Sequence, residues 1–193
     1  DFELLLCSEK SHYWYLIREV LISDIFERLI QRKSDHIKIL DIGAGNGSAG
    51  KQLSRYGDYI AYEYTGAGVR NCVKEGYPVI QGDAEHLSLK NTSIDVVCML
   101  DCLEHVRDDK RALSEIRRVL HDGGKMILFV PAYKFLWSSF DHFSFHYRRY
   151  SAKEIGVLLQ EKNLQVQKSF YCFSFLFPVI LFFSLFERIF RLK

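Results

Sequence analysis

The sequence predicts an α/β protein whose core is a doubly wound, mostly parallel β-sheet with helices on both faces. Short apolar runs alternate along the chain with amphipathic segments of helical period, which implies a parallel sheet covered on both sides. The first apolar run ends in a cluster of glycines, the pattern of a strand, a tight turn and a helix. A length of 193 residues favours one domain, residues 1–193, with its own core.

Each element is predicted from its local pattern. Ser151 and Glu154 fit a capping box, so a helix should begin at 151. Gly76 closes one helix, and Gly123 with Gly124 stops another. The predicted strands are 37–42, 59–64, 79–81, 94–100, 126–130 and 164–171, and the other predicted helices are 12–32, 69–75 and 108–120.

Charge and cysteine content argue against several classes of protein. The 26 basic and 24 acidic residues nearly balance, so nonspecific electrostatic binding of nucleic acid is not expected. The five cysteines form no CxxC pair and lack zinc-ligand spacing, so we expect no metal site and reduced, mostly buried thiols. With no signal peptide evident at the start of the chain, the sequence favours a cytoplasmic protein.

The segment 41–47 directly follows the first predicted strand and holds three glycines. Gly43, Gly45 and Gly47 let the backbone turn sharply and approach a ligand, and the helix that follows offers N–H groups at its start. Residues 45–50 also match the GxGxxG dinucleotide fingerprint, so an NAD(P)-dependent oxidoreductase is the alternative interpretation.

Two carboxylates favour a ligand that has an amino-acid end and no phosphates. Asp41, at the end of the first strand, would repel a pyrophosphate but can hold an ammonium group. Glu63 lies 22 residues later, at the end of the second strand, where a carboxylate can accept both ribose hydroxyls. Asp83 and Ala84 follow the third strand, where they can meet an adenine ring. The backbone around Leu100, after the fourth strand, would line the amino-acid end of the ligand.

Four motifs occur in order along the chain: ILDIGAGNG at 39–47, GDAEHL at 82–87, MLDCLEHV at 99–106 and LHDGGKMILFVP at 120–131. Together with Glu63 they resemble the class I S-adenosylmethionine-dependent methyltransferases, most closely the broad type 11/12 group. The resemblance covers roughly residues 10 to 175 and rests on several stacked motifs. It implies a Rossmann-like fold with S-adenosylmethionine as methyl donor and S-adenosylhomocysteine as product.

The resemblance extends to the N-terminal helix. The stretch HYWYLIR resembles one that covers the cofactor in related enzymes, so Arg18 is expected to pair with the methionine carboxylate. Tyr13 or Trp14 would close over the site, with plain core packing as the alternative. Glu63 departs from the Asp-hydrophobic-Ser pattern that relatives often show, and Tyr64 beside it is expected to pack on the adenine.

The segment 131–150 is a long loop rich in aromatic and titratable residues, and such loops are often functional. If the methyl acceptor is a hydroxyl or an amine, a base must take its proton. His142 or His146 can do so, and Asp141 can orient one of them. The alternative is that the cluster HYRRY only ties the loop to the fold. Expected acceptor-binding residues are Tyr133, Arg148 and Arg149, the arginines suiting a carboxylate or phosphate.

The C-terminal segment 170–186 is almost wholly apolar but short for a bilayer span, and Pro178 interrupts it. Burial in the core or at a subunit interface, such as a homodimer, is favoured over peripheral membrane contact. The resemblance implies a seventh strand for which no sequence remains, so a truncated chain is considered. The domain then divides into a cap helix (1–35), a core (36–172) and an apolar C-terminal helix (173–193).

The sequence therefore predicts a methyltransferase that uses S-adenosylmethionine and acts on a small-molecule, lipid or glycan acceptor. An oxidoreductase and a non-catalytic S-adenosylmethionine-binding protein remain as alternatives. Nucleic acid is not an expected partner, because the charge is balanced and no Asn/Asp-Pro-Pro-Tyr motif follows the fourth strand. The expected location is the cytoplasm, with membrane association as the alternative.

Overall fold

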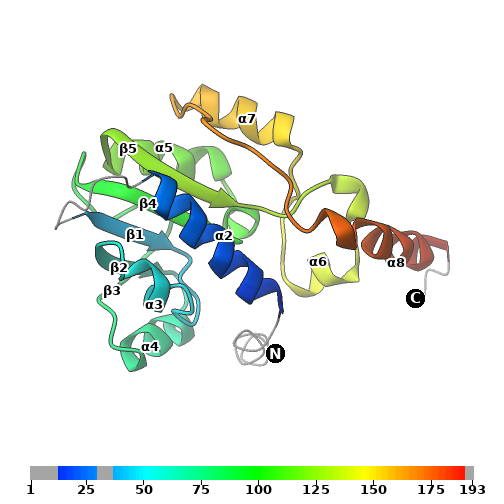
Figure 1. Cartoon of the computed structure of the whole chain (residues 1–193), viewed down its shortest axis with the longest axis horizontal. Coiled ribbons are helices and arrows are strands. Elements are labelled where there is room, and N and C mark those ends of the chain that lie inside the picture. Colours follow the sequence, from blue (N-terminus) through cyan, green and yellow to red (C-terminus); the bar gives the residue numbers. More distant parts are fainter. Residues whose placement is uncertain (1–12, 30–36, 190–193) are drawn as a thin grey trace.

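Five strands form one parallel sheet in the structure, a computed structural model that describes residues 13–29 and 37–189. The strand order is β3-β2-β1-β4-β5, and every neighbouring pair is parallel. The chain moves outward from β1 to β3 and then returns to place β4 on the other side of β1 (Figure 1). This confirms the predicted doubly wound α/β fold. The strands are β1 (Lys38–Ile42), β2 (Asp58–Glu63), β3 (Val79–Gln81), β4 (Ile94–Leu100) and β5 (Leu120–Phe129).

Helices pack on both faces of the sheet, as predicted. Buried side chains of α2, α3 and α4 join the core on one face, and those of α5 and α7 join the core on the other. Figure 1 shows α2 crossing in front of the strands with α5 behind them. These helices are α2 (Tyr13–Leu29), α3 (Gly50–Leu53), α4 (Gly66–Lys74), α5 (Asp109–Val119) and α7 (Ala152–Glu161).

The two cores follow from the alternation of side chains along the strands. Leu40 and Ile42 of β1 face one side and join the cluster that contains Ile116 of α5. Ile39, which directly precedes Leu40 and so points to the opposite face, joins the other cluster with Phe26 of α2. These side chains are at most 1% exposed. Each buried side chain of this size contributes about 1.5–3 kcal/mol of burial free energy, so packing from both sides holds the central strands in place.

Element boundaries that rest on local signals are confirmed. The Ser151 hydroxyl accepts a hydrogen bond from Glu154 N at 3.2 Å, and Glu154 Oε2 accepts from Ser151 N at 2.9 Å, which completes the capping box of α7. The carboxylate of Asp108 caps α5 by accepting from Arg111 N. Gly76 follows α4 with φ at 83°, a left-handed conformation that glycine adopts at helix ends.

The start of β5 corrects the prediction that Gly123 and Gly124 stop the preceding helix and that the strand covers 126–130. The helix α5 ends one residue before β5 begins, ahead of both glycines. The register between β4 and β5 shifts between Ile94 and Val96, which marks a β-bulge. Gly123 has φ at 79°, so the glycines shape the bulge within the strand rather than the end of the helix.

The predicted strand at 164–171 is wrong, because this segment is irregular and joins no sheet. Val166, Phe170 and Tyr171 are 43–48% exposed. A strand needs a partner for its backbone groups as well as apolar side chains, and this segment instead runs from α7 towards the C-terminal helix (Figure 1). Within the described residues, β5 is therefore the last strand on its side of the sheet.

The C-terminal helix α8 (Phe177–Ile189) follows a short turn, η4 (Ser174–Leu176), and projects from the side of the domain (Figure 1). Ser184 anchors it, since its buried hydroxyl donates to the backbone oxygens of Phe135 and Trp137. None of the helices in the described part of the chain is long and apolar enough to cross a membrane. Most of the remaining apolar side chains of α8 are exposed, including Val179, Phe182, Phe183, Leu185 and Phe186.

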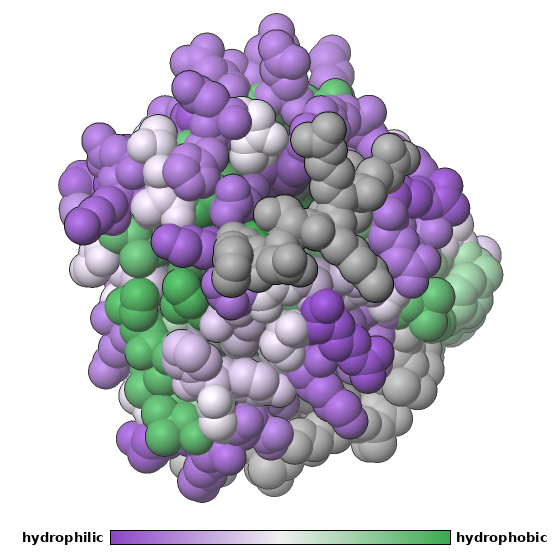
Figure 2. Space-filling view, turned by 60° about the vertical axis from the view of Figure 1, so that its left-hand side comes forward, coloured by the Kyte–Doolittle hydropathy of each residue, from purple (hydrophilic) through white to green (hydrophobic). Residues whose placement is uncertain are grey.

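Figure 2 shows another side of the molecule, on which hydrophilic residues predominate. Hydrophobic residues gather there in a strip on the left and a patch at the right-hand edge. Among the residues coloured by hydropathy in this view, the hydrophobic ones are thus confined to the strip and the edge patch, with hydrophilic neighbours around them.

We expect Ser151→Ala to lower the free energy of unfolding by about 1 kcal/mol, because the backbone N–H of Glu154 at the start of α7 loses the hydroxyl that caps it. The matched control is Lys153→Ala, a change at an exposed position in the same turn that leaves the capping box intact. Urea denaturation of both variants measures the difference. Equal stability of the two variants would contradict the assigned cap.

Candidate functional site

A large open cleft of about 1740 Å³ lies at the carboxyl ends of the strands. These ends meet at one edge because all five strands are parallel, and ligands bind at this edge in open α/β sheets. One half of the cleft is formed by the loops after β1, β2, β3 and β4, and the other by the segment 131–150 with η4 and α8. The predicted site residues that line it are Arg18, Asp41, Gly43, Gly45, Glu63, Tyr64, Asp83, Ala84, Leu100, Tyr133, His146 and Arg149.

The glycine loop after β1 adopts the backbone shape that its composition predicts. Gly43, Gly45 and Gly47 all have φ between 56° and 76°, which side-chain-bearing residues rarely adopt. A Cβ on Gly43 would lie 2.3 Å from the Cys102 sulfur, so the loop after β4 packs directly against the glycine. The loop therefore needs glycine for its backbone conformation and, at Gly43, also for space. Gly47 lies outside the residues that line the cleft.

Glu63 ties the end of β2 to the glycine loop. Its Oε2 accepts a hydrogen bond from Gly45 N at 2.9 Å, and its Oε1 accepts from Thr65 N at 2.8 Å and Thr65 Oγ1 at 2.7 Å. The residue is 5% exposed. A Cβ on Gly68 of α4 would lie 2.6 Å from Glu63 Cγ, so the carboxylate is held from that side as well. Its remaining lone pairs are the acceptors that it offers to the cleft.

Asp41 is the buried carboxylate at the end of β1. Its Oδ2 accepts a hydrogen bond from the Tyr59 hydroxyl at 2.9 Å. Burial raises the pKa of Asp41 to about 6, although the Tyr59 hydrogen bond and the positive charge of Arg18 act in the opposite direction. A cation that reached this carboxylate would relieve the cost of ionising it in the interior.

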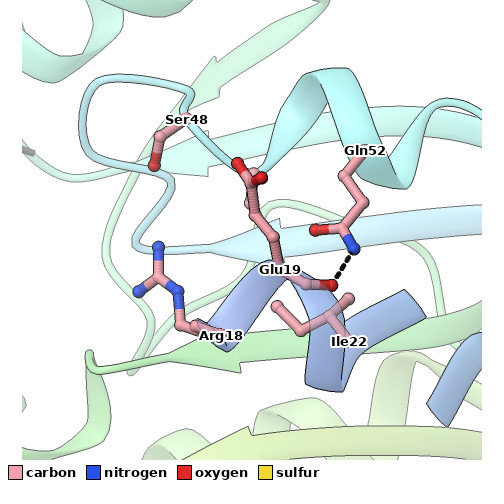
Figure 3. Close-up of a pocket in the computed structure, with 6 residues that line it drawn as sticks. Arg18, Glu19, Ile22, Ser48 and Gln52 are labelled. Atoms are coloured by element: carbon pink, nitrogen blue, oxygen red, sulfur yellow. Dashed lines mark hydrogen bonds between the residues drawn. The ribbon is translucent and has the colours of Figure 1, made fainter. Parts of the chain in front are cut away.

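Arg18 projects from α2 to the mouth of the cleft, where its Nη1 lies 2.9 Å from Asp101 Oδ2. Figure 3 shows it beside Ser48 of the glycine loop, with Gln52 of α3 donating to the backbone oxygen of Glu19. Gln52 also donates to the Ser23 hydroxyl at 2.6 Å. These contacts fix α2 against the segment that follows β1. The side chains of Tyr13 and Trp14 lie outside the described part of the chain.

The residues predicted to meet an adenine ring lie along one side of the cleft. Tyr64 is 71% exposed, so its ring is accessible. The carboxylate of Asp83 already accepts a hydrogen bond from Glu85 N at 2.9 Å, and Ala84 beside it is buried. Gly82 is required just before them, because a Cβ there would lie 2.1 Å from the Tyr62 hydroxyl. Leu100 is 7% exposed at the end of β4.

Asp141 organises the opposite half of the cleft. It lies in the short helix α6 (Ser139–Phe143), is fully buried, and accepts a hydrogen bond from His146 Nδ1 at 2.8 Å. Arg149 donates to both of its oxygens, at 2.6 and 2.9 Å, and Ser138 N donates at 2.9 Å. Burial opposes ionisation of Asp141, but these hydrogen bonds outweigh it and hold its pKa below the usual value. Asp141 therefore orients His146.

Glu104 and His105 lie close to His146, and neither was predicted from the sequence as a site residue. Both lie in η2 (Leu103–His105), within the motif that follows β4. Glu104 is 1% exposed, and burial followed by the charge of Asp101 raises its pKa well above the usual value. The rings of His105 and His146 meet edge to face, with their centroids 4.7 Å apart. The adjacent Glu104 and His105 within the motif MLDCLEHV could have marked a site in the sequence. Their proximity to His146 could not be predicted, because His146 lies about 40 residues further along the chain.

The other predicted acceptor residues have structural partners. Arg148 pairs with Asp109 at 2.8 Å and donates to a backbone oxygen, and it does not line the cleft. His142 also lies outside the cleft lining, where its Nε2 accepts from the Trp137 indole at 3.0 Å. Tyr133 lines the cleft, stacks on Tyr171 at 4.9 Å between ring centroids, and has φ at 59°, a strained conformation typical of functional loops.

The raised pKa of Asp41 predicts how stability depends on pH. The folded protein keeps a proton that the unfolded chain releases above about pH 4, so this group makes stability fall as pH rises from about 4 to about 6. The effect amounts to about 3 kcal/mol at neutral pH. Asp41→Asn should remove this part of the pH dependence and be the more stable protein at about pH 7.

Urea denaturation across this pH range measures the difference between the wild type and Asp41→Asn. The control is Asp58→Asn, which removes a carboxylate from the exposed start of β2. The account fails if Asp41→Asn and Asp58→Asn show the same pH dependence.

Comparison with known proteins finds relatives of the segment that carries the glycine loop and Glu63. Residues 40–128 match a family model described as a methyltransferase domain. A probable S-adenosylmethionine-dependent methyltransferase of Mycolicibacterium smegmatis is 27% identical over 164 residues, which cover 82% of this chain and 62% of that protein. A demethylmenaquinone methyltransferase of Streptomyces avermitilis is 32% identical over 94 residues, 47% of this chain and 41% of that protein. The chain thus spans less than two thirds of these relatives.

The fold agrees with the sequence comparison. A solved structure of a candidate sarcosine dimethylglycine methyltransferase from Galdieria sulphuraria matches with a TM-score of 0.68 at 17% identity, covering 81% of this chain and 64% of that one. The matched family segment extends from β1 to β5 and includes the glycine loop, Glu63 and the turn after β4. Residues 40–128 thus match the methyltransferase-domain family, and the relatives and the fold support a class I S-adenosylmethionine-dependent methyltransferase.

Proposed function

We propose that this chain transfers a methyl group from S-adenosylmethionine to a small-molecule or lipid acceptor with a polar end and an apolar body. One observation carries the proposal: a single cleft connects the glycine loop and Glu63 to the oriented His146 and then to the aromatic side chains beside α8. The cofactor half and the acceptor half therefore open to each other.

The cofactor would lie along the ends of β1, β2 and β4. Glu63 would accept the ribose hydroxyls, and Asp41 would attract the ammonium group of the methionine end. Asp83 with the backbone of Ala84 would meet the adenine. Arg18 supports the carboxylate of the methionine end, a role that it would share with its present ion pair to Asp101. The remaining contacts would come from Gly43 and Gly45, from Leu100, and from the ring of Tyr64.

The chemistry requires alignment and a place for one proton. The acceptor oxygen or nitrogen attacks the methyl carbon as the bond from that carbon to sulfur breaks, which releases S-adenosylhomocysteine. His146, oriented by Asp141, can accept the proton that the acceptor loses. His142 does not line the cleft, so we assign the role to His146. Arg149 acts here as a positioning residue for Asp141.

The apolar character of the acceptor is inferred from the walls of the cleft. Phe140, Phe143 and Phe145 line it and are each more than half exposed. Phe177 and Ile180 of α8 continue this wall towards the exposed apolar face of the helix. A lipid-like acceptor could thus lie across the cleft with its apolar body against these residues. The demethylmenaquinone named for the Streptomyces relative supports an acceptor in this class.

The exposed face of α8 is then the surface through which the enzyme would reach the acceptor at a membrane surface, with a second copy of the chain as the alternative occupant. Its exposed side chains include Val179, Phe182, Phe183 and Phe186, and an apolar face of this kind occurs on helices that lie on lipid. The thiols of Cys72 and Cys98 are free and buried, which supports a reducing compartment such as the cytoplasm.

We expect a phenol that bears an isoprenoid chain to be methylated with kcat/KM at least about tenfold higher than the same phenol without the chain, because only the former buries apolar surface in the cleft. Transfer of a labelled methyl group from S-adenosylmethionine measures both rates. His146→Ala should lower kcat by a factor of about 10² or more and leave cofactor affinity unchanged.

His142→Ala is the matched control, since it removes an imidazole four residues away that does not line the cleft. Its activity should equal that of the wild type. Equal losses in both variants, or equal rates with the two phenols, would refute the assigned acceptor half.

A further inference from the structure

Three ligand-type side chains converge at the point where the two halves of the cleft meet. One carboxylate oxygen of Glu104 and one ring nitrogen each of His105 and His146 all lie within 4.8 Å of one another. All three residues line the cleft. The set joins the turn after β4 to the segment 131–150, so it forms only when the fold brings these segments together.

One oxygen of the buried Glu104 carboxylate has no hydrogen-bond partner in the cluster. Glu104 is 1% exposed, and its Oε2 has no hydrogen-bond partner among the described residues. A buried polar atom without a partner is destabilising, and more so when it is charged, so such atoms are rare unless a ligand or ion satisfies them. The unpartnered oxygen belongs to the same carboxylate that faces the two imidazoles.

His146 is held as histidine ligands of metal ions usually are. Nδ1 of His146 is hydrogen-bonded to Asp141 at 2.8 Å, which leaves Nε2 as the nitrogen available to a ligand. Arg149 in turn fixes Asp141 through both carboxylate oxygens. A carboxylate behind an imidazole, as Asp141 lies behind His146, is a typical outer shell of a histidine that binds a metal ion.

We propose that Glu104, His105 and His146 bind one divalent first-row transition metal ion, with Zn²⁺ as the best match. Two imidazoles and one carboxylate form a typical catalytic zinc set, and nitrogen ligands disfavour Mg²⁺ and Ca²⁺. Donor atoms at about 2.0–2.1 Å from a tetrahedral ion are about 3.4 Å apart, so donor atoms that now lie within 4.8 Å of one another would approach by up to about 1.4 Å. Three protein ligands leave a fourth position for a molecule in the cleft.

The role of the ion rests on the proposed function, whereas its binding does not. An acceptor hydroxyl in the fourth position would become more acidic on the metal ion and lose its proton to solvent. The resulting oxygen anion forms the new bond to the methyl carbon while the carbon–sulfur bond breaks and S-adenosylhomocysteine leaves. In the metal-bound enzyme, His146 is then a ligand rather than the group that accepts the proton.

The test is a titration of chelator-treated protein with Co²⁺, followed by visible absorption, and with Zn²⁺, followed by calorimetry. We expect one ion per chain with the absorption of a tetrahedral cobalt site. Glu104→Gln, which keeps the size of the side chain, and His146→Ala should each weaken metal binding by a factor of about 100 or more. Loss of a residue that only hydrogen-bonds to a metal ligand already weakens binding by up to about 100-fold, and these two residues are the ligands themselves. His142→Ala should bind as the wild type does.

The proposal is overturned if binding is not stoichiometric, or if Glu104→Gln binds Co²⁺ as tightly as His142→Ala. Methyl transfer assayed in parallel keeps the two proposals apart. Full activity in protein that binds no metal ion refutes the metal site and leaves the proposed function standing. Stoichiometric binding that Glu104→Gln abolishes, together with no transfer to either phenol, supports the metal site and counts against the proposed acceptor.

Discussion

The carboxylate of Glu63 is the contact on which the cofactor half of the cleft depends. It accepts hydrogen bonds from Gly45 N, Thr65 N and Thr65 Oγ1, and so joins the ends of two parallel strands through one buried side chain. The parallel register of β1 and β2 brings these ends to the same level, and the absence of a side chain at Gly68 leaves room for the carboxylate. Without Glu63, a strained glycine loop would lose its main support from β2.

A second buried carboxylate does the same for the acceptor half. Asp141 holds His146 and Arg149, and Arg149 also donates to the backbone oxygen of Ala132 at 3.2 Å. The segment 131–150 is therefore held together mainly by hydrogen bonds to the Asp141 carboxylate, and not by the backbone hydrogen bonds of a β-sheet. Tyr147 N donates to the backbone oxygen of Glu104 at 2.8 Å, which joins this half to the turn after β4. The reacting groups would meet where the two carboxylate-centred halves touch.

The sequence predicted features that depend on local patterns. The strands from β1 to β4, the capping box at Ser151 and the order of the site motifs follow from composition and spacing, because such signals act over a few residues. The segment 164–171 has the composition of a strand, yet it forms none because composition does not supply a partner. The bulge at Gly123 could not be predicted from the sequence either, because glycine is typical both of the end of a helix and of a bulge in a strand.

The acceptor half shows a similar division. His142 and His146 are equivalent in the sequence, and only the fold shows that Asp141 binds one and Trp137 the other. Arg148 resembles a ligand-binding residue until Asp109, far away in the sequence, neutralises it. Pairings between distant segments cannot be inferred from spacing, and they determine which polar residues face the cleft.

The cofactor half of the cleft carries the central claim, and calorimetric titration with S-adenosylmethionine, S-adenosylhomocysteine and NADH tests it most directly. The account predicts that both sulfur ligands bind and NADH does not. It also predicts that Gly43→Ala weakens their binding at least about tenfold, because the new methyl group would meet Cys102. Gly76→Ala introduces similar backbone strain where no atom lies within 4 Å and should bind normally. Binding of NADH alone, or unchanged affinity in Gly43→Ala, would contradict the account.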